Sequence, residues 1–568
     1  MSRKSQIHVS SPRSVRPAAA ACLTAHCRRA NHATETGTHQ TEPPRDHAQG
    51  RRLKEMPRSR KHRMDPVWQD QSSMRISQHD AGATLAPDLD PPHSRAALST
   101  AYGGAIPHPD EPTRTRFLSQ LRGIVGAGAV VSEPAALVSY EGDGYMARAR
   151  PLAVCLPTTT GQVSDAIRLA RQYGFPVTPR GAGTGLSGGA TPIHGGLVIA
   201  TSRMHRIREI DAENMRAIVE PGLVNVDLTR AAEPFGLYFA PDPSSQTAST
   251  IGGNVAENAG GPHCLAYGVT TNHVLGMEAV LIDGTIVSCG TMASSPDAPG
   301  YDIPGILTGS EGTLAFVTAV CVRLMPRAET VRTVLALFDT FNDAGAATSA
   351  IIEAGIIPAA LEFVDGVTIS ALRGGGFPEY PEGVEALLLV EVEGLSEACA
   401  EDASHVEALL TQYGAREVRV AASVAERQRL WRGRKGALGA LGRLAPNYYI
   451  QDGVVPRSRL VEVLTKVQDL AKRENLLIAN VFHAGDGNLH PNILYDARIP
   501  GLTERVIKAG EEILRACIDA GGTLSGEHGV GLEKAAYLDW VMSPADRETQ
   551  ACVKRVFDEG GWLNPGKP

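Results

Sequence analysis

Two histidines flank a turn signal in the C-terminal third of the chain, and their spacing suits a shared metal ion. His483 and His490 lie on either side of Asp486-Gly487, a residue pair that readily forms a tight hairpin turn. With that pair at the tip, His483 faces His490 across the hairpin with Cβ atoms ~5 Å apart, and Asn492 shares their face. The alternative interpretation is that both imidazoles are ordinary polar residues of a hairpin.

A carboxylate and a third imidazole follow farther along the chain. Glu527 and His528 form the middle of a Gly-Glu-His-Gly sequence, whose glycines allow the loop to approach a ligand closely. Two histidines and one carboxylate suit a divalent cation and leave coordination positions open for a substrate. The sequence therefore predicts a metal site of His483, His490 and Glu527, with zinc, manganese or iron as candidates.

Three glycine-rich segments, at 179–189, 250–261 and 309–314, form a second signal. Glycines in the first segment let backbone N–H groups converge without obstruction by Cβ atoms, which makes a nest for an anion such as a pyrophosphate. No helix is expected directly after it and it contains no lysine, so it is neither a Rossmann fingerprint nor a P-loop. A plain tight turn would explain any one segment, but three joined to strands favour an extended cofactor lying across a sheet.

These residues need a scaffold, and the apolar periodicity predicts one. The clearest helix spans 159–174, with Thr159 and Gln162 as a capping box and Gly174 as its end. Further helices are expected at 115–126, 396–413, 425–441, 457–474 and 503–520, and strands at 151–157, 175–179, 196–201, 277–282, 285–289, 315–324 and 448–455. Both halves mix helices and strands around a boundary near 326–332, so the predicted class is α+β.

The composition limits the class of protein. The chain has 568 residues, of which 43% are hydrophobic, so it is long enough for two to four domains with real cores. Its net charge of −7 does not suit nucleic acid as a partner, and no stretch approaches the ~18 consecutive apolar residues of a membrane span. Nine cysteines without a CxxC pair argue against an iron–sulfur cluster or zinc ribbon and suit a reducing compartment.

The beginning of the chain differs from the rest. Residues 1–64 contain 14 Lys and Arg against 4 Asp and Glu, and no sustained apolar period precedes residue 113. We interpret residues 1–112 as a disordered basic extension. A non-functional tail is the plain interpretation; a transit peptide, a nucleic-acid contact and a true start at Met64 or Met74 are the alternatives.

Longer motifs in and after the glycine segments carry a family resemblance. They are PRGAGTGLSGG, APDPSSQ, TIGGNVAENAGGPH, YGVTTNHVLG and GSEGTLAFVT. Together they resemble the FAD domain of the p-cresol methylhydroxylase / vanillyl-alcohol oxidase superfamily. From about Phe117 to Pro568 the chain is similar to the FAD-linked oxidases that include glycolate oxidase catalytic subunits and D-lactate dehydrogenases. The resemblance implies a two-part FAD-binding domain at 113–328 and an α+β cap domain for the substrate at 329–568.

The resemblance also implies how FAD is held. The segment 180–189 would wrap the pyrophosphate, and 311–313 would lie near the flavin ring. The binding is expected to be non-covalent, because Ala182-Gly183-Thr184 stands where relatives often carry a histidine bonded to the flavin. The implied cofactor-binding residues are Pro179, Arg180, Gly181, Ala182, Gly183, Thr184, Gly185, Gly188, Pro241, Ser244, Thr250, Gly252, Gly253, Asn254, Asn258, Gly260, Glu311, Gly312, Thr313 and Asn564.

The same resemblance gives roles to the candidate catalytic residues, which are His528, Arg434 and Asn492. Relatives bind a metal with the matching His, His and Glu, and His528 would stay free as the base. Arg434 occupies the place of a carboxylate-clamping arginine, although a solvated basic turn would also explain its surroundings. Leu438 and Ile450 stand where relatives that act on larger diacids carry Thr and Lys, which favours a small monocarboxylate. Asp452 is expected to be structural.

The predicted reaction is the FAD-dependent, metal-assisted oxidation of a small 2-hydroxy acid, glycolate or D-lactate, to the 2-oxo acid. Hydride would pass to flavin N5 and the hydroxyl proton to the histidine base. The alternatives are a D-2-hydroxyglutarate-type dehydrogenase, a metal-dependent hydrolase that uses the same His/Glu cluster, and a non-catalytic flavin-binding subunit.

The chain's partners and location are expected to follow from this chemistry. Without iron–sulfur ligands of its own, the chain is expected to pass electrons to iron–sulfur or flavin partner subunits, a quinone or a cytochrome. We expect a cytoplasmic protein, at most peripheral to the inner membrane, for which a homodimer is compatible with the sequence.

Overall fold

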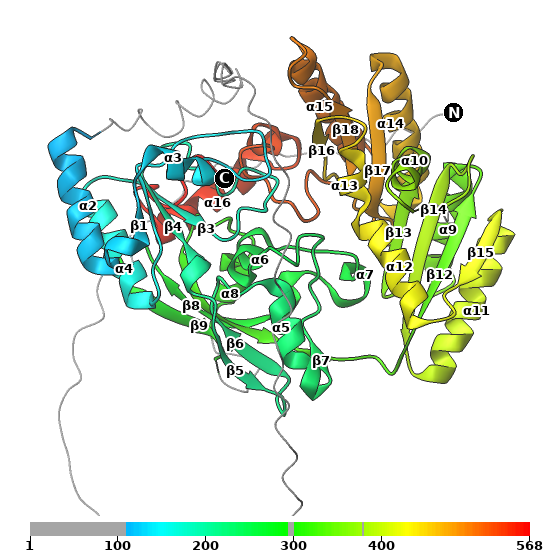
Figure 1. Ribbon diagram of the computed structural model, residues 1–568, viewed down its shortest axis with the longest axis horizontal. Coiled ribbons are helices and arrows are strands. Elements are labelled where there is room, and N and C mark those ends of the chain that lie inside the picture. The colour runs from blue at the N-terminus through cyan, green and yellow to red at the C-terminus, as the bar shows by residue number, and fades with distance from the viewer. Residues whose placement is uncertain (1–108, 293–299, 378–379, 568) are drawn as a thin grey trace, which may run out of the picture. The chain divides into compact units, whose positions relative to one another are not determined.

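The computed structural model of the protein describes residues 109–292, 300–377 and 380–567. The predicted extension therefore lies outside the described residues up to position 108. The first half of the described chain forms a four-stranded and a five-stranded sheet, and the second half forms a seven-stranded sheet (Figure 1). None of the described helices is long and apolar enough to cross a membrane.

The four-stranded sheet has the order β1-β2-β4-β3, with three parallel strands and β1 antiparallel at one edge. Its strands are β1 (Val130–Val131), β2 (Ala153–Cys155), β4 (Leu197–Ala200) and β3 (Val177–Arg180). Helices α2 (Glu111–Val125) and α4 (Thr160–Gln172) share its apolar core, and α3 (Pro134–Leu137) follows β1. Asp110 caps α2 and Pro112 lies in its first turn, so the last two residues of the predicted extension are helical.

Helix α4 begins as the sequence predicts, with one difference in its cap. The Thr159 hydroxyl accepts a hydrogen bond from the backbone N–H of Gln162. The Gln162 side chain reaches back to the N–H of Thr158 rather than to that of Thr159. The Thr159 hydroxyl thus satisfies one of the free N–H groups of the first turn.

The five-stranded sheet is antiparallel, with the order β5-β6-β10-β8-β9. Its strands are β5 (Ile207–Asp211), β6 (Arg216–Val219), β10 (Phe316–Arg323), β8 (Val274–Val280) and β9 (Ile286–Gly290). The predicted hairpin around Asp283-Gly284 is β8–β9. The remaining elements of this half are α5 (Asn225–Ala232), β7 (Leu237–Tyr238), α6 (Ile251–Glu257), α7 (Cys264–Tyr267), α8 (Ile303–Leu307) and β11 (Met325–Pro326).

The second glycine segment is a short helix rather than a loop. Thr250 caps α6, because its hydroxyl accepts a hydrogen bond from the N–H of Gly253. Gly252 lies against Pro221, where a Cβ atom would come within 2.5 Å of the proline side chain. The glycines thus allow α6 to pack closely against a neighbouring loop.

The seven-stranded sheet of the second half, which we call the cap sheet, is antiparallel. Its strand order is β15-β12-β14-β13-β17-β18-β16. Its strands are β15 (Glu417–Val420), β12 (Thr330–Phe338), β14 (Ala386–Gly394), β13 (Ala360–Asp365), β17 (Leu477–His483), β18 (Pro491–Tyr495) and β16 (Asn447–Ile450). One face packs against α9 (Phe341–Glu353), α11 (Ser396–Gln412), α14 (Leu460–Glu474) and α15 (Leu502–Asp519). The other face packs against α10 (Gly366–Gly374), α12 (Val424–Lys435) and α13 (Ala437–Leu441). The helix predicted at 425–441 is thus two helices that meet at Gly436.

The C-terminal segment also contacts the first half of the described chain. After α16 (Pro544–Phe557), Leu563 pairs with Val177 of β3 and lies in the core of the four-stranded sheet. The Asn564 side chain donates hydrogen bonds to the carbonyls of Gly189 and Glu311. The last residues of the chain therefore join the first and third glycine segments, a contact that no local sequence pattern reveals.

A buried charge cluster joins the two halves beside α7. The His263 Nδ1 atom lies 3.0 Å from a carboxylate oxygen of Asp242, and Nε2 lies 3.6 Å from one of Glu391 on β14. The His263 ring stacks on Trp431 of α12, whose indole N–H donates to Glu391. Burial alone would lower the pKa of His263, but the two carboxylates outweigh it and raise the pKa to about 10.

This cluster gives a prediction about stability and pH. Because the pKa of His263 is raised in the folded state, its ion pairs stabilise the fold fully below about pH 6.5. This stabilisation is lost as the pH rises toward about 10. We expect the free energy of unfolding of His263→Gln to be about 3 kcal/mol lower than that of wild type at pH 7. Between pH 7 and 10, wild type should lose more stability than His263→Gln in urea unfolding curves. Parallel loss in both proteins would contradict the assignment.

Candidate active site

A cavity of about 440 Å³ lies where the glycine segments meet the cap sheet. Most of the predicted cofactor-binding residues line it. They are Pro179, Arg180, Gly181, Ala182, Gly183, Thr184, Gly185, Ser244, Thr250, Gly252, Gly253, Asn254, Glu311 and Gly312. From the cap side it is lined by Arg434, His483, His490, Glu527 and His528. The structure therefore brings the two sequence signals, glycine segments and His/Glu cluster, to one cavity.

Two glycines of the first segment leave no room for a Cβ atom. A Cβ atom on Gly181 would lie 2.5 Å from the Thr250 hydroxyl, and one on Gly183, where φ is +73°, would meet the Arg180 guanidinium. Arg180, which also lines the cavity, donates to the carbonyls of Gly142 and Ser139, so its side chain holds a neighbouring loop. The backbone of this segment is therefore free to face a ligand, which suits a pyrophosphate.

Several predicted cofactor residues are not part of the cavity lining, and the structure gives them other contacts. The Pro241 carbonyl accepts a hydrogen bond from Asn225, and the Thr313 hydroxyl donates to Ser310. Asn258 ends α6 in the left-handed conformation, and its side chain accepts from the N–H of Thr271. Gly188, Gly260 and Asn564 also lie outside the lining. These residues shape the loops around the cavity, so a direct contact with FAD stays a prediction for each of them.

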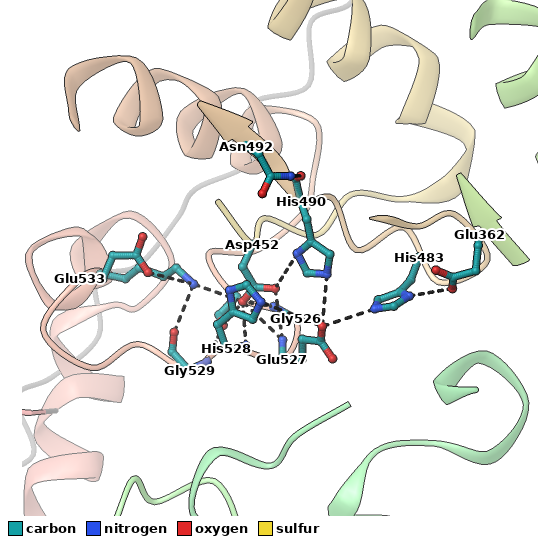
Figure 2. A network of polar contacts seen from close by, with 12 residues as sticks. Glu362, Asp452, His483, His490, Asn492, Gly526, Glu527, His528, Gly529 and Glu533 are labelled. Atoms are coloured by element: carbon teal, nitrogen blue, oxygen red, sulfur yellow. Dashed lines mark hydrogen bonds and ion pairs between the residues drawn. The ribbon is translucent and has the colours of Figure 1, made fainter. Parts of the chain in front are cut away.

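The predicted metal ligands converge on one carboxylate oxygen (Figure 2). Oε1 of Glu527 lies 3.4 Å from Nε2 of His483 and 3.2 Å from Nε2 of His490. One ligand atom from each of the three residues lies within 4.8 Å of the others. His483 and His490 are 4% and 7% exposed, and neither ring nitrogen of His490 makes a hydrogen bond within the part of the chain that the structure describes. Buried imidazole nitrogens that converge on a carboxylate, with no hydrogen bond at His490, fit a divalent cation.

The hairpin register differs from the prediction by two residues. His483 pairs with Asn488, not with His490, and residues 484–487 form a four-residue turn. Because side chains on a strand alternate between faces, a shift of two keeps His490 on the same side as His483. Their ring centres are 5.2 Å apart, so the expected closeness holds despite the wrong pairing.

A second group of possible ligands, formed by Asp452, His490 and His528, is less suited to a metal. Asp452 is fully buried and accepts hydrogen bonds from the Ser525 hydroxyl, the N–H groups of Gly526 and His528, and the Lys534 ammonium. An ammonium 3.1 Å from the carboxylate occupies the place of a cation. The expectation that Asp452 is structural fits these contacts, because they fix the loop that carries Glu527 and His528.

His528 has the environment of a neutral imidazole. Burial lowers its pKa to about 4, and His490 and Lys534 act in the same direction against Asp452. Its ring stacks on that of His490 with centres 4.9 Å apart, and its Nδ1 makes no hydrogen bond to any described residue. An unprotonated nitrogen at the cavity is able to accept a proton.

Arg434 and Asn492 differ in their access to the cavity. Arg434 lines it and pairs with Glu362, which also accepts a hydrogen bond from His483. Burial would raise the pKa of Glu362, but Arg434 and His483 lower it to about 2, so Glu362 is ionised. Asn492 is fully buried outside the lining, and its amide donates to the carbonyls of His490 and Ala479. Asn492 therefore holds the hairpin, and substrate contact stays a prediction for it.

Some cavity residues were missed by sequence reasoning. Glu257 lies within the motif TIGGNVAENAGGPH and lines the cavity, but no role was predicted for it. Its pKa is raised by burial and by the nearby Glu311 and Asp143, which favours the neutral carboxyl. Asp143 accepts from the N–H of Ala190, directly after the first glycine segment, and the Gly-Asp-Gly sequence around it was an available signal. Glu362, which does not line the cavity but contacts His483 and Arg434, had no signal, because only strand pairing places it opposite His483.

Comparisons with known proteins agree with this geometry. A model of an FAD binding domain matches residues 151–290, and a model of the C-terminal domain of FAD linked oxidases matches residues 327–568. The glycolate oxidase subunit GlcD of Escherichia coli K12 is 43% identical over 465 residues, which cover 82% of this chain and 92% of that protein. A D-lactate dehydrogenase of Anaerostipes hadrus is 34% identical, covering 74% of this chain and 90% of that protein.

The chain belongs to the FAD-linked oxidase family. This confirms the resemblance seen in the motifs, and it makes the protein an FAD-dependent oxidoreductase. The solved structure of p-cresol methylhydroxylase covers 80% of this FAD-linked oxidase and 97% of its own chain, with a TM-score of 0.68 and 16% identity. A 4-ethylphenol oxidase from Gulosibacter chungangensis matches with a TM-score of 0.67 and 18% identity. These two matches confirm the predicted α+β fold.

Proposed function

We propose that this FAD-linked oxidase oxidises a small 2-hydroxy acid, glycolate or D-lactate, to the 2-oxo acid with the help of a divalent metal ion. The observation that carries the proposal is the buried cluster of His483, His490 and Glu527 beside a neutral His528, in the same cavity as the glycine segments. The names of the relatives, glycolate oxidase subunit and D-lactate dehydrogenase, support the substrate class.

The residues of the cavity divide the chemistry. Oxidation removes a hydride from Cα and a proton from the hydroxyl, and the buried, unprotonated His528 accepts that proton. Arg434 binds and orients the substrate carboxylate through its fork of N–H donors. When bound, FAD supplies the acceptor of the hydride, and a divalent ion held by the triad of His483, His490 and Glu527 supplies positive charge that favours the deprotonated hydroxyl. FAD is expected to be non-covalent, since no histidine stands in residues 179–189.

The wall near Arg434 favours a short side chain on the substrate. Leu438, Ile450 and Val481 line this part of the cavity and offer no partner for a second carboxylate. Lys435 also lines the cavity, but its ammonium lies 3.6 Å from the carboxylate of Asp242. A diacid such as D-2-hydroxyglutarate would leave its distal carboxylate unpaired against an apolar wall, which is costly. The hydrolase alternative loses its support, because the chain is an FAD-linked oxidase.

The electron acceptor is proposed from the relative's description as a subunit. GlcD is named a subunit of glycolate oxidase. We propose that this chain likewise works with iron–sulfur or flavin partner subunits and passes electrons to a quinone or a cytochrome. Co-purification of the tagged chain, followed by iron analysis of the complex, tests this part.

A substrate panel tests the proposed function directly. The FAD-loaded protein, made anaerobic, is mixed with glycolate, D-lactate, L-lactate or D-2-hydroxyglutarate, and absorbance near 450 nm is followed with and without a chelator. Glycolate or D-lactate should bleach the flavin, and the other two should do so at least about 100-fold more slowly. Bleaching by L-lactate alone, or equal bleaching after complete metal removal, would contradict the proposal.

A further inference from the structure

Glu362 lies between the two groups that the proposed reaction needs for substrate binding. It is fully buried on β13, where the strand register pairs it with His483 of β17. One carboxylate oxygen accepts a hydrogen bond from Nδ1 of His483 at 2.7 Å (Figure 2). The other lies 2.5 Å from a guanidinium nitrogen of Arg434. A single side chain thus contacts both a candidate metal ligand and the candidate carboxylate clamp.

The contact with His483 selects which ring nitrogen is free. A neutral imidazole carries its proton on one nitrogen, and the Glu362 carboxylate accepts only from a protonated one. With the proton on Nδ1, the Nε2 lone pair faces Oε1 of Glu527, 3.4 Å away. A metal ligand at this position needs a lone pair on Nε2, which this tautomer provides. The carboxylate at the other ring nitrogen also makes the ligand more basic.

The contact with Arg434 fixes a flexible cation at the cavity. Arg434 is 6% exposed, and its Nε makes no hydrogen bond within the described residues. Because Glu362 anchors one end of the planar guanidinium, the group's orientation is set before the substrate arrives. Without that anchor, a buried guanidinium would lack a counter-ion.

We propose that Glu362 is a positioning residue that couples metal binding to carboxylate recognition, by holding His483 in its metal-binding tautomer and Arg434 in place. This inference rests on the proposed function, and it adds a residue that acts only through His483 and Arg434. It predicts that one substitution weakens two separate properties, metal affinity and substrate affinity.

The test compares Glu362→Gln with Asp365→Asn in the FAD-loaded protein. A glutamine keeps the shape but has one oxygen and one NH2 group, so it is unable to present an oxygen to both His483 and Arg434 and carries no charge to pair with the guanidinium. Asp365 is the matched control: it lies on the same strand, and its partners are Asn480 of β17 and Thr368 of α10. Affinity for Mn²⁺ and Zn²⁺ is measured by isothermal titration of the metal-depleted proteins, and KM and kcat by flavin reduction with D-lactate or glycolate.

We expect Glu362→Gln to bind the metal about 10- to 100-fold more weakly and to raise KM about tenfold or more. Asp365→Asn should lower the unfolding temperature and leave metal affinity within about twofold of wild type. Arg434→Gln should raise KM without weakening the metal, and the double variant Glu362→Gln/Arg434→Gln should have no higher KM than Arg434→Gln alone. Glu362→Asp, which keeps the charge, should fall between wild type and Glu362→Gln and also serves if the glutamine variant does not fold.

Two outcomes overturn the inference while leaving the proposed function intact. One is a Glu362→Gln protein whose metal affinity and KM both stay within about twofold of wild type. The other is an Asp365→Asn protein that loses the metal as strongly as Glu362→Gln does. A wild-type protein that binds no divalent ion, or oxidises no 2-hydroxy acid, overturns both proposals and is recognised from wild type alone.

Discussion

Replacing His528 by glutamine is expected to slow flavin reduction by glycolate or D-lactate by about 10²- to 10⁴-fold. The physical reason is that the reaction then lacks a positioned acceptor for the hydroxyl proton. Burial lowers the pKa of His528 to about 4, so the ring is unprotonated at neutral pH and is able to accept this proton. Stopped-flow mixing of the FAD-loaded, anaerobic protein with substrate, followed near 450 nm, measures the rate.

A matched control separates loss of the base from loss of a buried imidazole. His273 is also buried, its Nε2 contacts the carbonyl of Tyr267, and it does not line the cavity. The His273→Gln protein should therefore keep the wild-type rate of flavin reduction. His528→Gln should keep its FAD and its metal content. A His528→Gln protein that reduces flavin at the wild-type rate would show that another group takes the proton.

Removing the divalent ion is expected to reduce the rate by about 10³-fold or more, without loss of FAD. A metal at the triad is worth several kcal/mol because it stabilises the charge that develops on the substrate oxygen. Metal analysis before and after chelation, and flavin reduction after adding back Zn²⁺, Mn²⁺ or Fe²⁺, measure the effect. Full activity in protein that contains no detectable divalent ion would contradict the metal site.

Two substitutions distinguish which group of residues holds the metal. Glu527→Gln removes the carboxylate that lies within 3.4 Å of both hairpin histidines, and it should empty the site. Asp452→Asn alters the other candidate group, whose carboxylate is already paired with Lys534. We expect Asp452→Asn to be less stable but to retain the metal. Retention in Glu527→Gln with loss in Asp452→Asn would assign the ion to the second group.

Local patterns in the chain were sufficient for much of the scaffold. The cap of α4 at Thr159 and the β8–β9 turn at Asp283-Gly284 depend on residues close in sequence. The turn and the Thr159 hydroxyl contact form as predicted, whereas Gln162 bonds to Thr158 instead of completing the capping box. Boundaries failed where distant or flanking residues intervene. Gly436 divides the helix predicted at 425–441, and the Thr250 cap turns the second glycine segment into α6. Short-range preferences are weak there, and packing decides between similar conformations.

The identity of the chemical groups was likewise present in the sequence. The sequence indicates the available chemistry through its glycine segments, the two histidines around a turn and the Glu527-His528 pair. The hairpin argument reached the correct face with an incorrect register, because an even shift preserves the side of the strand.

Only the tertiary structure decided how those groups are combined. Glu362 reaches His483 through β13–β17 pairing across more than a hundred residues, and Asn564 joins two glycine segments from the end of the chain. Asp452 is paired with the ammonium of Lys534, whereas the carboxylate of Glu527 lies against the hairpin histidines. Long-range strand pairing and burial set these partners, and neither is encoded in the spacing of nearby residues. The chain alone determined the chemistry that was possible, and folding determined which side chains share one buried cavity.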